Sequence, residues 1–155
     1  MDIKEKADLV IATAGGYPKD INFYQSSKLL LNSREAVKEW GTLIALTECS
    51  EGLGGDDDVR SILASYDNLL DREKSLRERY TISKHVGCLA CETAQTFNLI
   101  LVSNLDPKFL KNTGIKIVKT IDEALNLTYA EKGRNLKTYI MPHGANTLPK
   151  LPPIE

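Results

Sequence analysis

The 155-residue sequence lacks the marks of several protein classes, and each absence narrows the interpretation. It has no apolar run of bilayer length, because its least charged stretch, 87–105, contains Glu92 and several amide and hydroxyl side chains. Its first six residues lack the apolar core and the small-residue cleavage site of a signal peptide. We therefore expect neither a membrane span nor export.

The sequence also has no excess of charge of one sign, since it contains 20 lysines and arginines and 21 aspartates and glutamates. Phosphate contacts need a clustered positive face, so we expect no nucleic-acid partner and no membrane partner. Cysteine is scarce, with three residues, and an odd number without an export signal favours reduced thiols in the cytoplasm. Neither G-x-G-x-x-G nor G-x-x-x-x-G-K-[ST] occurs, so no dinucleotide or ATP site is predicted.

What is present is the composition of an ordinary globular domain, 42% hydrophobic and 26% charged. A chain of this length buries roughly 70% of its unfolded surface, so a core without disulfides or metal is expected. We predict a single α/β domain over 1–147. Residues 148–155 contain three prolines, which lack backbone donors, and we interpret them as a proline-rich tail.

Short apolar, β-branched runs alternate with segments of helical periodicity. The runs are uniformly apolar, as in parallel strands that are buried on both faces. The predicted fold is α/β, doubly wound and Rossmann-like, with a five-stranded mainly parallel sheet and helices on both faces. The expected strands are 9–14, 42–47, 98–103, 115–119 and 137–141.

The segments between these runs carry capping residues that predict where helices begin and end. Asp20 is expected to cap the first helix, Pro107 to open a short one, and Gly114 and Gly133 to follow helix ends. Residues 52–81 are unusually hydrophilic and are interpreted as an exposed helical insertion. The expected helical segments are 21–39 (as one helix or two), 57–70, 83–97, 107–111 and 121–131.

The segment 14–28, which joins the first strand to the first helix, is the most informative. Ligands of open α/β sheets gather at the carboxyl ends of strands. There, Gly15 and Gly16 would allow a close approach, and the free amides of the following helix would attract an anion. The sequence therefore predicts a binding site at this junction.

The helix expected to begin near Ile21 carries polar groups on an otherwise apolar stripe. Ile21, Tyr24, Lys28 and Leu31 recur at helical spacing, with Gln25 beside them. In one interpretation, Lys28 extends along the surface to water and Gln25 is an ordinary surface residue. In the other, the phenol, amide and ammonium bind a small carboxylate.

Cysteine and histidine offer two further candidate sites. His85, Cys88 and Cys91 recur every three residues and Cys49 follows the second strand, so a Cys₃His zinc site is arithmetically open. Three ligands within two turns drift around the helix axis, however, and small residues packed on a sheet explain the spacing more simply. A thioredoxin-like pair is disfavoured because its first thiol falls inside the helix. We predict structural cysteines.

Other polar groups follow strands or open helices. His143 follows the fifth strand, which leaves both a structural and a binding role open. The acidic run 56–58 suits the capping of a helix better than a metal site. Residues 48–52 follow the second strand and are candidates to line the same cleft as 14–28.

Two long stretches, 15–28 (GGYPKDINFYQSSK) and 48–54 (ECSEGLG), resemble the C-terminal domain of the nickel-pincer-dependent lactate racemase family. Weaker landmarks of the same family are 84–87 (KHVG) and 141–149 (MPHGANTLP). The chain departs from the family at 39–41, where Glu-Trp-Gly stands in place of a frequent proline-glycine turn.

The resemblance implies one half of a two-domain racemase or epimerase, an isomerase of lactate-type 2-hydroxy acids with its cleft between the domains. A nickel-pincer nucleotide would accept a hydride while a histidine removes the hydroxyl proton. In the family, the catalytic histidines, the lysine that tethers the cofactor and the nickel-ligating histidine belong to the N-terminal domain. Tyr24, Gln25 and Lys28 would face substrate and cofactor from the C-terminal side.

The resemblance further implies that this chain holds no catalytic residue and no metal ligand, binds no cofactor by itself and is inactive alone. Its expected partners are the N-terminal catalytic domain and a small hydroxy acid. Two alternatives remain at this point: a free-standing small-anion-binding or regulatory module, and a structural zinc module.

Overall fold

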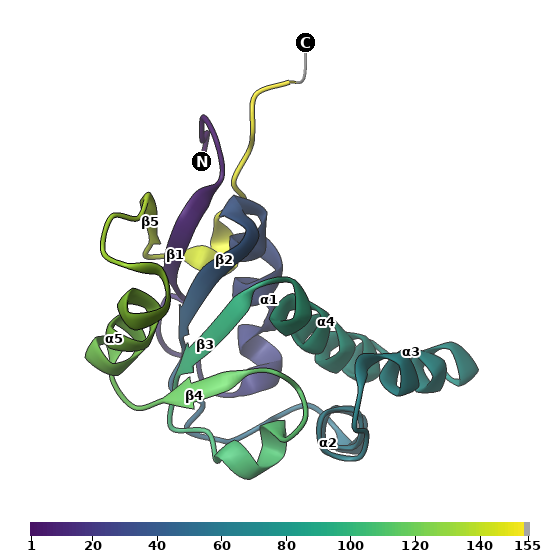
Figure 1. The fold of residues 1–155 in the computed structure, drawn as a ribbon. Helices are drawn as coiled ribbons and strands as arrows, with labels where there is room; N and C mark the ends of the chain where they lie inside the picture. Colours follow the sequence, from purple (N-terminus) through teal and green to yellow (C-terminus); the bar gives the residue numbers. More distant parts are fainter. Residues whose placement is uncertain (154–155) are drawn as a thin grey trace.

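Five strands form a single parallel sheet in the order β4-β3-β2-β1-β5 (Figure 1). The computed structural model describes residues 1–153, so 154 and 155 of the predicted tail lie outside the described residues. The predicted five-stranded α/β fold is confirmed, and the pairing is parallel throughout. The strands are β1 (Ala7–Thr13), β2 (Val37–Leu46), β3 (Asn98–Val102), β4 (Lys116–Val118) and β5 (Thr138–Met141).

The strand order explains why helices cover both faces. From β1 the chain steps outward to β2 and β3 through α1 (Phe23–Ser33) and α4 (Ile82–Thr96). After β4 it returns across the sheet to β5 through α5 (Ile121–Lys132). Because parallel crossovers are right-handed, reversing the direction places the helix on the opposite face. Figure 1 shows α5 on one side of the sheet and α1 and α4 on the other.

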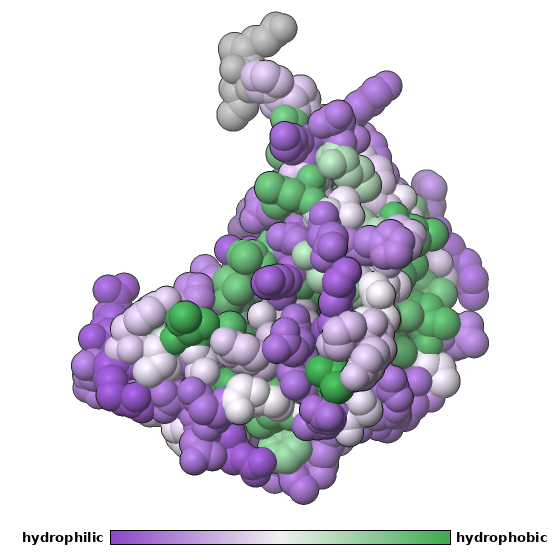
Figure 2. Space-filling view, turned by 180° about the vertical axis from the view of Figure 1, so that it is seen from behind, coloured by the Kyte–Doolittle hydropathy of each residue, from purple (hydrophilic) through white to green (hydrophobic). Residues whose placement is uncertain are grey.

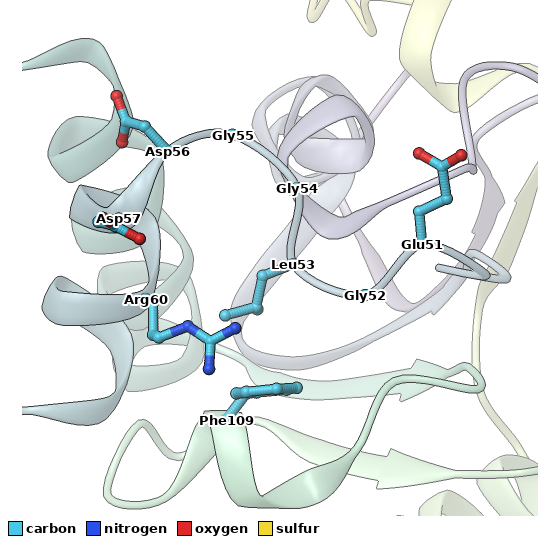
Figure 3. Close-up of a pocket in the computed structure, with 9 residues that line it drawn as sticks. All are labelled: Glu51, Gly52, Leu53, Gly54, Gly55, Asp56, Asp57, Arg60 and Phe109. Carbon is cyan, nitrogen blue, oxygen red and sulfur yellow. The ribbon is translucent and has the colours of Figure 1, made fainter.

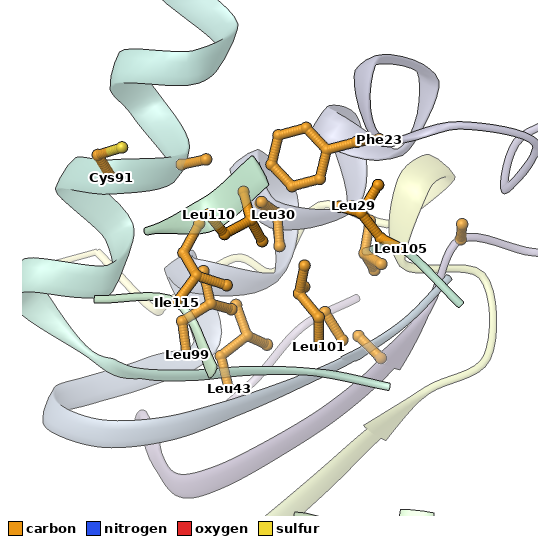
Figure 4. Packing of buried hydrophobic residues seen from close by; sticks show 14 of the residues in the cluster. Phe23, Leu29, Leu30, Leu43, Cys91, Leu99, Leu101, Leu105, Leu110 and Ile115 are labelled. Atoms are coloured by element: carbon orange, nitrogen blue, oxygen red, sulfur yellow. The ribbon is translucent and has the colours of Figure 1, made fainter. Parts of the chain in front are cut away.

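The inner strands supply two apolar clusters, one on each face. Leu43, Leu99 and Leu101 pack toward α1 and α4, where Figure 4 shows them opposite Phe23 and Leu29. The alternate residues Leu9, Ile44 and Ile100 pack against Ala124 of α5. Successive side chains of a strand point to opposite faces, so each inner strand must be apolar throughout.

The prediction that all five strands are buried on both faces is wrong for the edges of the sheet. Ile140 of β5 is 67% exposed, and Lys116 of β4 is also exposed. An edge strand has a neighbour on one side only, and α5 packs mainly against β2, β3 and β4 rather than β5. Elsewhere apolar residues reach the surface in small groups among hydrophilic ones, as the view from behind shows (Figure 2).

The cap of α1 differs from the sequence prediction. Residues 16–21 form turns in which Lys19 N–H donates to Gly16 O and Ile21 N–H to Pro18 O. The helix therefore begins later, and Asn22 rather than Asp20 caps it by accepting from Gln25 N–H at 2.9 Å. Gly133, with φ of 77°, ends α5 as predicted.

Other boundaries also move. The segment 21–39 contains α1, a 3₁₀ turn (Arg34–Ala36) and the start of β2, which begins earlier than predicted. As expected, Pro107 opens a short helical segment, which is a 3₁₀ turn (Pro107–Leu110). Asp106 caps this turn. Gly114 has a left-handed φ of 80° but lies beyond that turn, just before β4, so it ends no helix.

The hydrophilic segment 52–81 is helical as predicted but consists of two helices, α2 (Asp57–Ala64) and α3 (Leu69–Glu78). One helix over 57–70 is therefore wrong. The predicted exposure is wrong for α2, whose Val59, Ile62 and Leu63 are fully buried. These apolar residues are spaced three and four apart, which gives α2 one buried face against α4.

The two ends of the chain lie side by side. Ile3 N–H donates to Lys150 O, and Lys150 N–H donates to Met1 O, both at 2.9 Å. The first residues of the predicted tail therefore pair with residues 1–3 in a short parallel bridge. Over residues 1–153 no helix combines the length and apolarity that a membrane span needs.

Candidate functional site

The loops after β1 and β2 meet at the N-terminus of α1. Phe23 N–H donates to Gly52 O at 3.0 Å and Tyr24 N–H to Leu53 O at 2.9 Å. The next amide, of Gln25, is bound by the Asn22 side chain. These first-turn amides are therefore occupied, and the expectation that they attract an anion is wrong.

Backbone hydrogen bonds also join the loop after β2 to the loop after β1. Cys49 N–H donates to Asp20 O and Glu51 N–H to Ile21 O, both at 2.8 Å. Gly54 has φ of 63°, and a Cβ there would lie 2.1 Å from Cγ of Asn22, so only glycine fits. The two stretches that carry the family resemblance thus form one clamp around the start of α1.

Hydroxyl groups extend this clamp into the interior. Ser26 Oγ donates to Asn22 O at 2.9 Å and also bonds to the Thr47 hydroxyl, which lies 3.5 Å from Sγ of Cys49. Burial raises the pKa of the Cys49 thiol, so this cysteine is a packing residue rather than a nucleophile.

The loop after β5 supports α1 from the other side. Asn32 Nδ2 donates to the carbonyls of Gly144 and Ala145, both at 3.1 Å. A Cβ at Gly144 would lie 2.5 Å from Cδ1 of Leu29, so this loop approaches the helix as closely as a backbone can. The weaker landmark 141–149 therefore positions α1.

The predicted stripe of α1 faces outward. The helix buries Phe23, Ser26, Leu29, Leu30 and Ser33 against the sheet. On the opposite side, Gln25 and Lys28 are exposed and Tyr24 is half-buried.

The three predicted site residues share this outer face and differ in how they are held. A Cβ at Gly55 would lie 3.1 Å from Cδ2 of Tyr24, which places the phenol ring against the glycine loop. Lys28 forms no ion pair within residues 1–153. A half-held ring and an unpaired ammonium at the carboxyl edge of the sheet suit a binding surface.

Two cavities flank the clamp. One, of about 370 Å³, is lined by Pro18, Lys19, Ile21, Asn22, Gln25 and Glu51. The other, of about 410 Å³, is lined by residues 51–57 with Arg60 and Phe109 (Figure 3). The Arg60 guanidinium lies 4.9 Å from the centroid of the Phe109 ring, a cation–π contact.

The prediction that 48–52 and 14–28 line one cleft agrees with the cavity shared by Lys19 and Glu51. Sequence reasoning did not, however, single out either residue, nor Arg60 or Phe109. Lys19 and Glu51 lie inside the two stretches of family resemblance, and that position is the signal that would have found them. Arg60 and Phe109 come from distant segments, and nothing in the sequence pairs them.

The structure does not bring together the four residues of the possible Cys₃His zinc site. Residues 1–153 contain no group of three histidine, cysteine or acidic side chains that would hold a metal ion. Cys88 and Cys91 are buried, which raises the pKa of each thiol to about 11. The His85 ring is exposed, with its centroid 6.1 Å from that of Tyr80. The cysteines pack as structural residues.

The other two candidates also have identified positions. Asp56 caps α2 by accepting from Asp58 N–H at 3.0 Å, so the acidic run is a helix start as predicted. His143 is exposed, and its Nδ1 lies 3.5 Å from the point where a Cβ of Gly15 would stand. The ends of β1 and β5 therefore meet here, where the direction of the sheet winding reverses.

Comparison with known proteins agrees with this architecture. A family model described as "Lactate racemase C-terminal domain" matches residues 3–148. The lactate racemase of Lactiplantibacillus plantarum is 31% identical over 153 residues, which cover 92% of this chain and 35% of that protein. The lactate racemase of Thermoanaerobacterium thermosaccharolyticum is 27% identical over 146 residues, covering 92% and 34%.

A solved structure shows the same fold. The lactate racemase apoprotein of Thermoanaerobacterium thermosaccharolyticum superposes with a TM-score of 0.84 at 24% identity, covering 96% of this chain and 36% of that chain. The chain thus spans about a third of the length of the relatives it matches.

Proposed function

This chain belongs to the lactate racemase C-terminal domain family, and from that premise we propose that it forms one wall of a 2-hydroxy acid racemase or epimerase site. The observation that carries the proposal is the outer face of α1. It presents Tyr24, Gln25 and Lys28 at the carboxyl edge of the sheet, on a helix held from both sides.

Each of the three side chains has a distinct role in this proposal. The Lys28 ammonium, which is exposed, pairs with the substrate carboxylate. The Tyr24 hydroxyl and the Gln25 amide donate and accept hydrogen bonds around the same ligand. Groups on a clamped helix need little reordering when the ligand arrives, which favours orientation of the substrate.

The nickel-pincer nucleotide supplies the hydride acceptor when it is bound in such an enzyme. Tyr24, Gln25 and Lys28 do not fit the role of nickel ligands, because an ammonium repels a divalent cation and neutral phenols and amides bind it weakly. We therefore propose that the N-terminal domain holds the cofactor, and that this chain contributes contacts to the substrate and no catalytic base.

The remaining parts of the proposal concern the whole protein. The relatives are about three times as long as the matched segment, which supports an N-terminal catalytic domain as partner. This chain, with its domain at 1–147, is then inactive alone. Three unpaired buried thiols support a reducing, cytoplasmic setting.

A two-part complementation assay tests the function. The chain is mixed with a separately expressed, cofactor-loaded N-terminal half of the enzyme, and D- and L-lactate are resolved by chiral analysis. Racemisation in the mixture, and in neither part alone, is the expected result. The half that lacks this chain also serves as the control for residual activity.

Two other results separate the alternatives. Association of the halves without racemisation of lactate redirects the assay to other 2-hydroxy acids. Failure of the halves to associate contradicts the proposal and favours the free-standing anion-binding module, which the exposed and unpaired Lys28 would equally serve.

A further inference from the structure

The cavity of about 370 Å³ beside Gln25 has a lining that matches the substrate class of the proposed function. It is lined by Lys19, Glu51 and Gln25, residues that carry an ammonium, a carboxylate and an amide, and by the apolar residues Pro18 and Ile21. A small 2-hydroxy acid carries a carboxylate, a hydroxyl donor and a short apolar group. Each group of the ligand therefore has a counterpart in the lining.

The two charged groups of this lining do not neutralise each other. Neither Lys19 nor Glu51 forms an ion pair within residues 1–153, with each other or with any other side chain. Both side chains are exposed. Both residues line one cavity, so their charges remain available to a ligand bound there.

The ammonium of Lys19 is directed by its neighbours. With the Asn146 amide oriented so that its oxygen faces Lys19, Nζ donates to it at 3.2 Å. The same Nζ lies 3.9 Å from the point where a Cβ of Gly15 would stand. An ammonium has three donors, so this hydrogen bond orients Lys19 and leaves donors for a carboxylate.

Glu51 is positioned from its backbone. Its N–H donates to Ile21 O at 2.8 Å, which holds the residue against the loop after β1. In Figure 3 its side chain points away from Arg60 and Phe109 and toward that loop. The carboxylate therefore belongs to the Gln25 side of the clamp.

We propose that Lys19 and Glu51 are further binding residues for the 2-hydroxy acid, Lys19 for its carboxylate in addition to Lys28, and Glu51 for its hydroxyl hydrogen. Glu51 is then the specificity-determining group, since it distinguishes a hydroxy acid from the same acid without a hydroxyl. This inference rests on the proposed function for the class of ligand, but it makes a claim about binding to this chain by itself.

The test is a binding titration of the isotope-labelled chain, followed by NMR, with three acids of one carbon skeleton. Lactate, propanoate and alanine differ only in the group at carbon 2, which is a hydroxyl, a hydrogen or an ammonium. We expect lactate to shift the Gln25 and Glu51 signals and to bind tighter than propanoate, because only lactate donates a hydroxyl hydrogen to Glu51. Equal binding of lactate and propanoate, or binding of alanine alone, would overturn the inference, because the site would then ignore the hydroxyl or select an amino acid.

Two variants give different signatures. Lys19→Met should weaken lactate and propanoate alike, by about tenfold or more, since both lose one charge-assisted hydrogen bond. Glu51→Gln should lower the preference for lactate over propanoate, because the uncharged amide oxygen is a weaker acceptor for the lactate hydroxyl. The loss of the negative charge also removes a repulsion that both carboxylate ligands share, so it does not affect the preference. Lys74→Met and Glu73→Gln, exposed on α3, are the matched controls and should bind as the parent chain does.

The remaining outcomes separate this inference from the proposed function. If lactate binds and only Lys28→Ala weakens it, the Lys19–Glu51 site is refuted while the proposed function stands. If lactate leaves the chain's spectrum unchanged, the inference fails even when the two-part assay gives racemisation. If lactate binds but neither lactate nor any other 2-hydroxy acid is racemised in the two-part assay, the proposed function alone is refuted.

Discussion

Positive charge is used in two opposite ways in this molecule. In the segment from α2 to α4, Arg72 of α3 is 1% exposed and Lys84 of α4 is 7% exposed, and both donate to protein acceptors. At the start of α1, Lys19 and Lys28 are exposed and no carboxylate pairs with them within residues 1–153. The buried cations hold structure together, whereas the exposed ones remain available to a ligand.

The buried pair shows how charge is buried without a counter-ion. Arg72 donates to the carbonyls of Ile62, Leu63 and Tyr66, which lie near the end of α2, and to Asn112 O. The negative end of the helix dipole and four hydrogen bonds replace a carboxylate. The comparison predicts that substitutions in the two regions separate stability from binding.

The largest effect is expected at Arg72. Arg72→Met removes four hydrogen bonds and leaves buried carbonyls without donors, so the free energy of unfolding should fall by about 3–5 kcal/mol. Urea unfolding followed by circular dichroism measures it. The control Arg77→Met, exposed on the same helix, should change stability by less than about 0.5 kcal/mol. Equal effects of the two substitutions would contradict a structural role for the buried guanidinium.

A smaller loss of stability is expected where the clamp meets α1. Gly54→Ala places a Cβ against Asn22 at a left-handed φ, so it combines backbone strain with loss of the helix cap, about 2–3 kcal/mol together. Gly52→Ala is the matched control, because its φ is 74° but a Cβ there meets nothing within 4 Å. It should cost about 1 kcal/mol, from strain alone. Thermal unfolding of both variants checks the difference, and equal losses would show that the cap contributes nothing.

At Lys28 the expected effect moves from stability to activity. Lys28→Ala should lower racemisation in the two-part assay by about tenfold to a hundredfold, because the substrate carboxylate loses a charged partner. Its unfolding free energy should change by less than about 0.5 kcal/mol, since the side chain is exposed. Lys74→Ala on α3 is the control in both measurements. Unchanged kinetics would remove Lys28 from the site.

The smallest effect concerns pH. The hydrogen bond from Arg79, followed by that from Thr81, lowers the pKa of Asp58 below its ordinary value. A lowered folded-state pKa means that this stabilisation is present above the ordinary carboxyl range and is lost as pH falls through the lowered value. Relative to the parent chain, Asp58→Asn should therefore be less stable at neutral pH and equally stable in acid. A difference in unfolding free energy that persists in acid would exclude this carboxylate as its source.

Local patterns were sufficient for the order and type of the main elements. Uniformly apolar runs such as 98–103 predict inner strands because neighbours on both faces exclude water. The same rule failed for β5, since strand order decides which runs become edges. The capping prediction at Asp20 failed for another reason, because turns within 16–21 delay the start of the helix.

The candidate site was predictable only in part. Helical spacing predicts that Tyr24, Gln25 and Lys28 share one face, and the structure leaves them on one outer face, but only the family resemblance implies their role. The rule for carboxyl ends of strands predicts that the loops of Lys19 and Glu51 line one cleft, but not that these two residues line it. The role of Lys84 was hidden as well, because its acceptors at Ser75 belong to another helix.

The sequence by itself determined the alternation of strands and helices, the parallel sheet and the polar face of α1, because these depend on residues a few positions apart. The tertiary structure alone decided the strand order, the hydrogen bonds of the clamp around α1 and which side chains line the cavity beside Gln25. Those features depend on contacts such as Asn32 with Gly144, which are 112 positions apart in the chain. Close packing of distant segments, which brings unpaired charges to one place while burying others, has no signature in local periodicity.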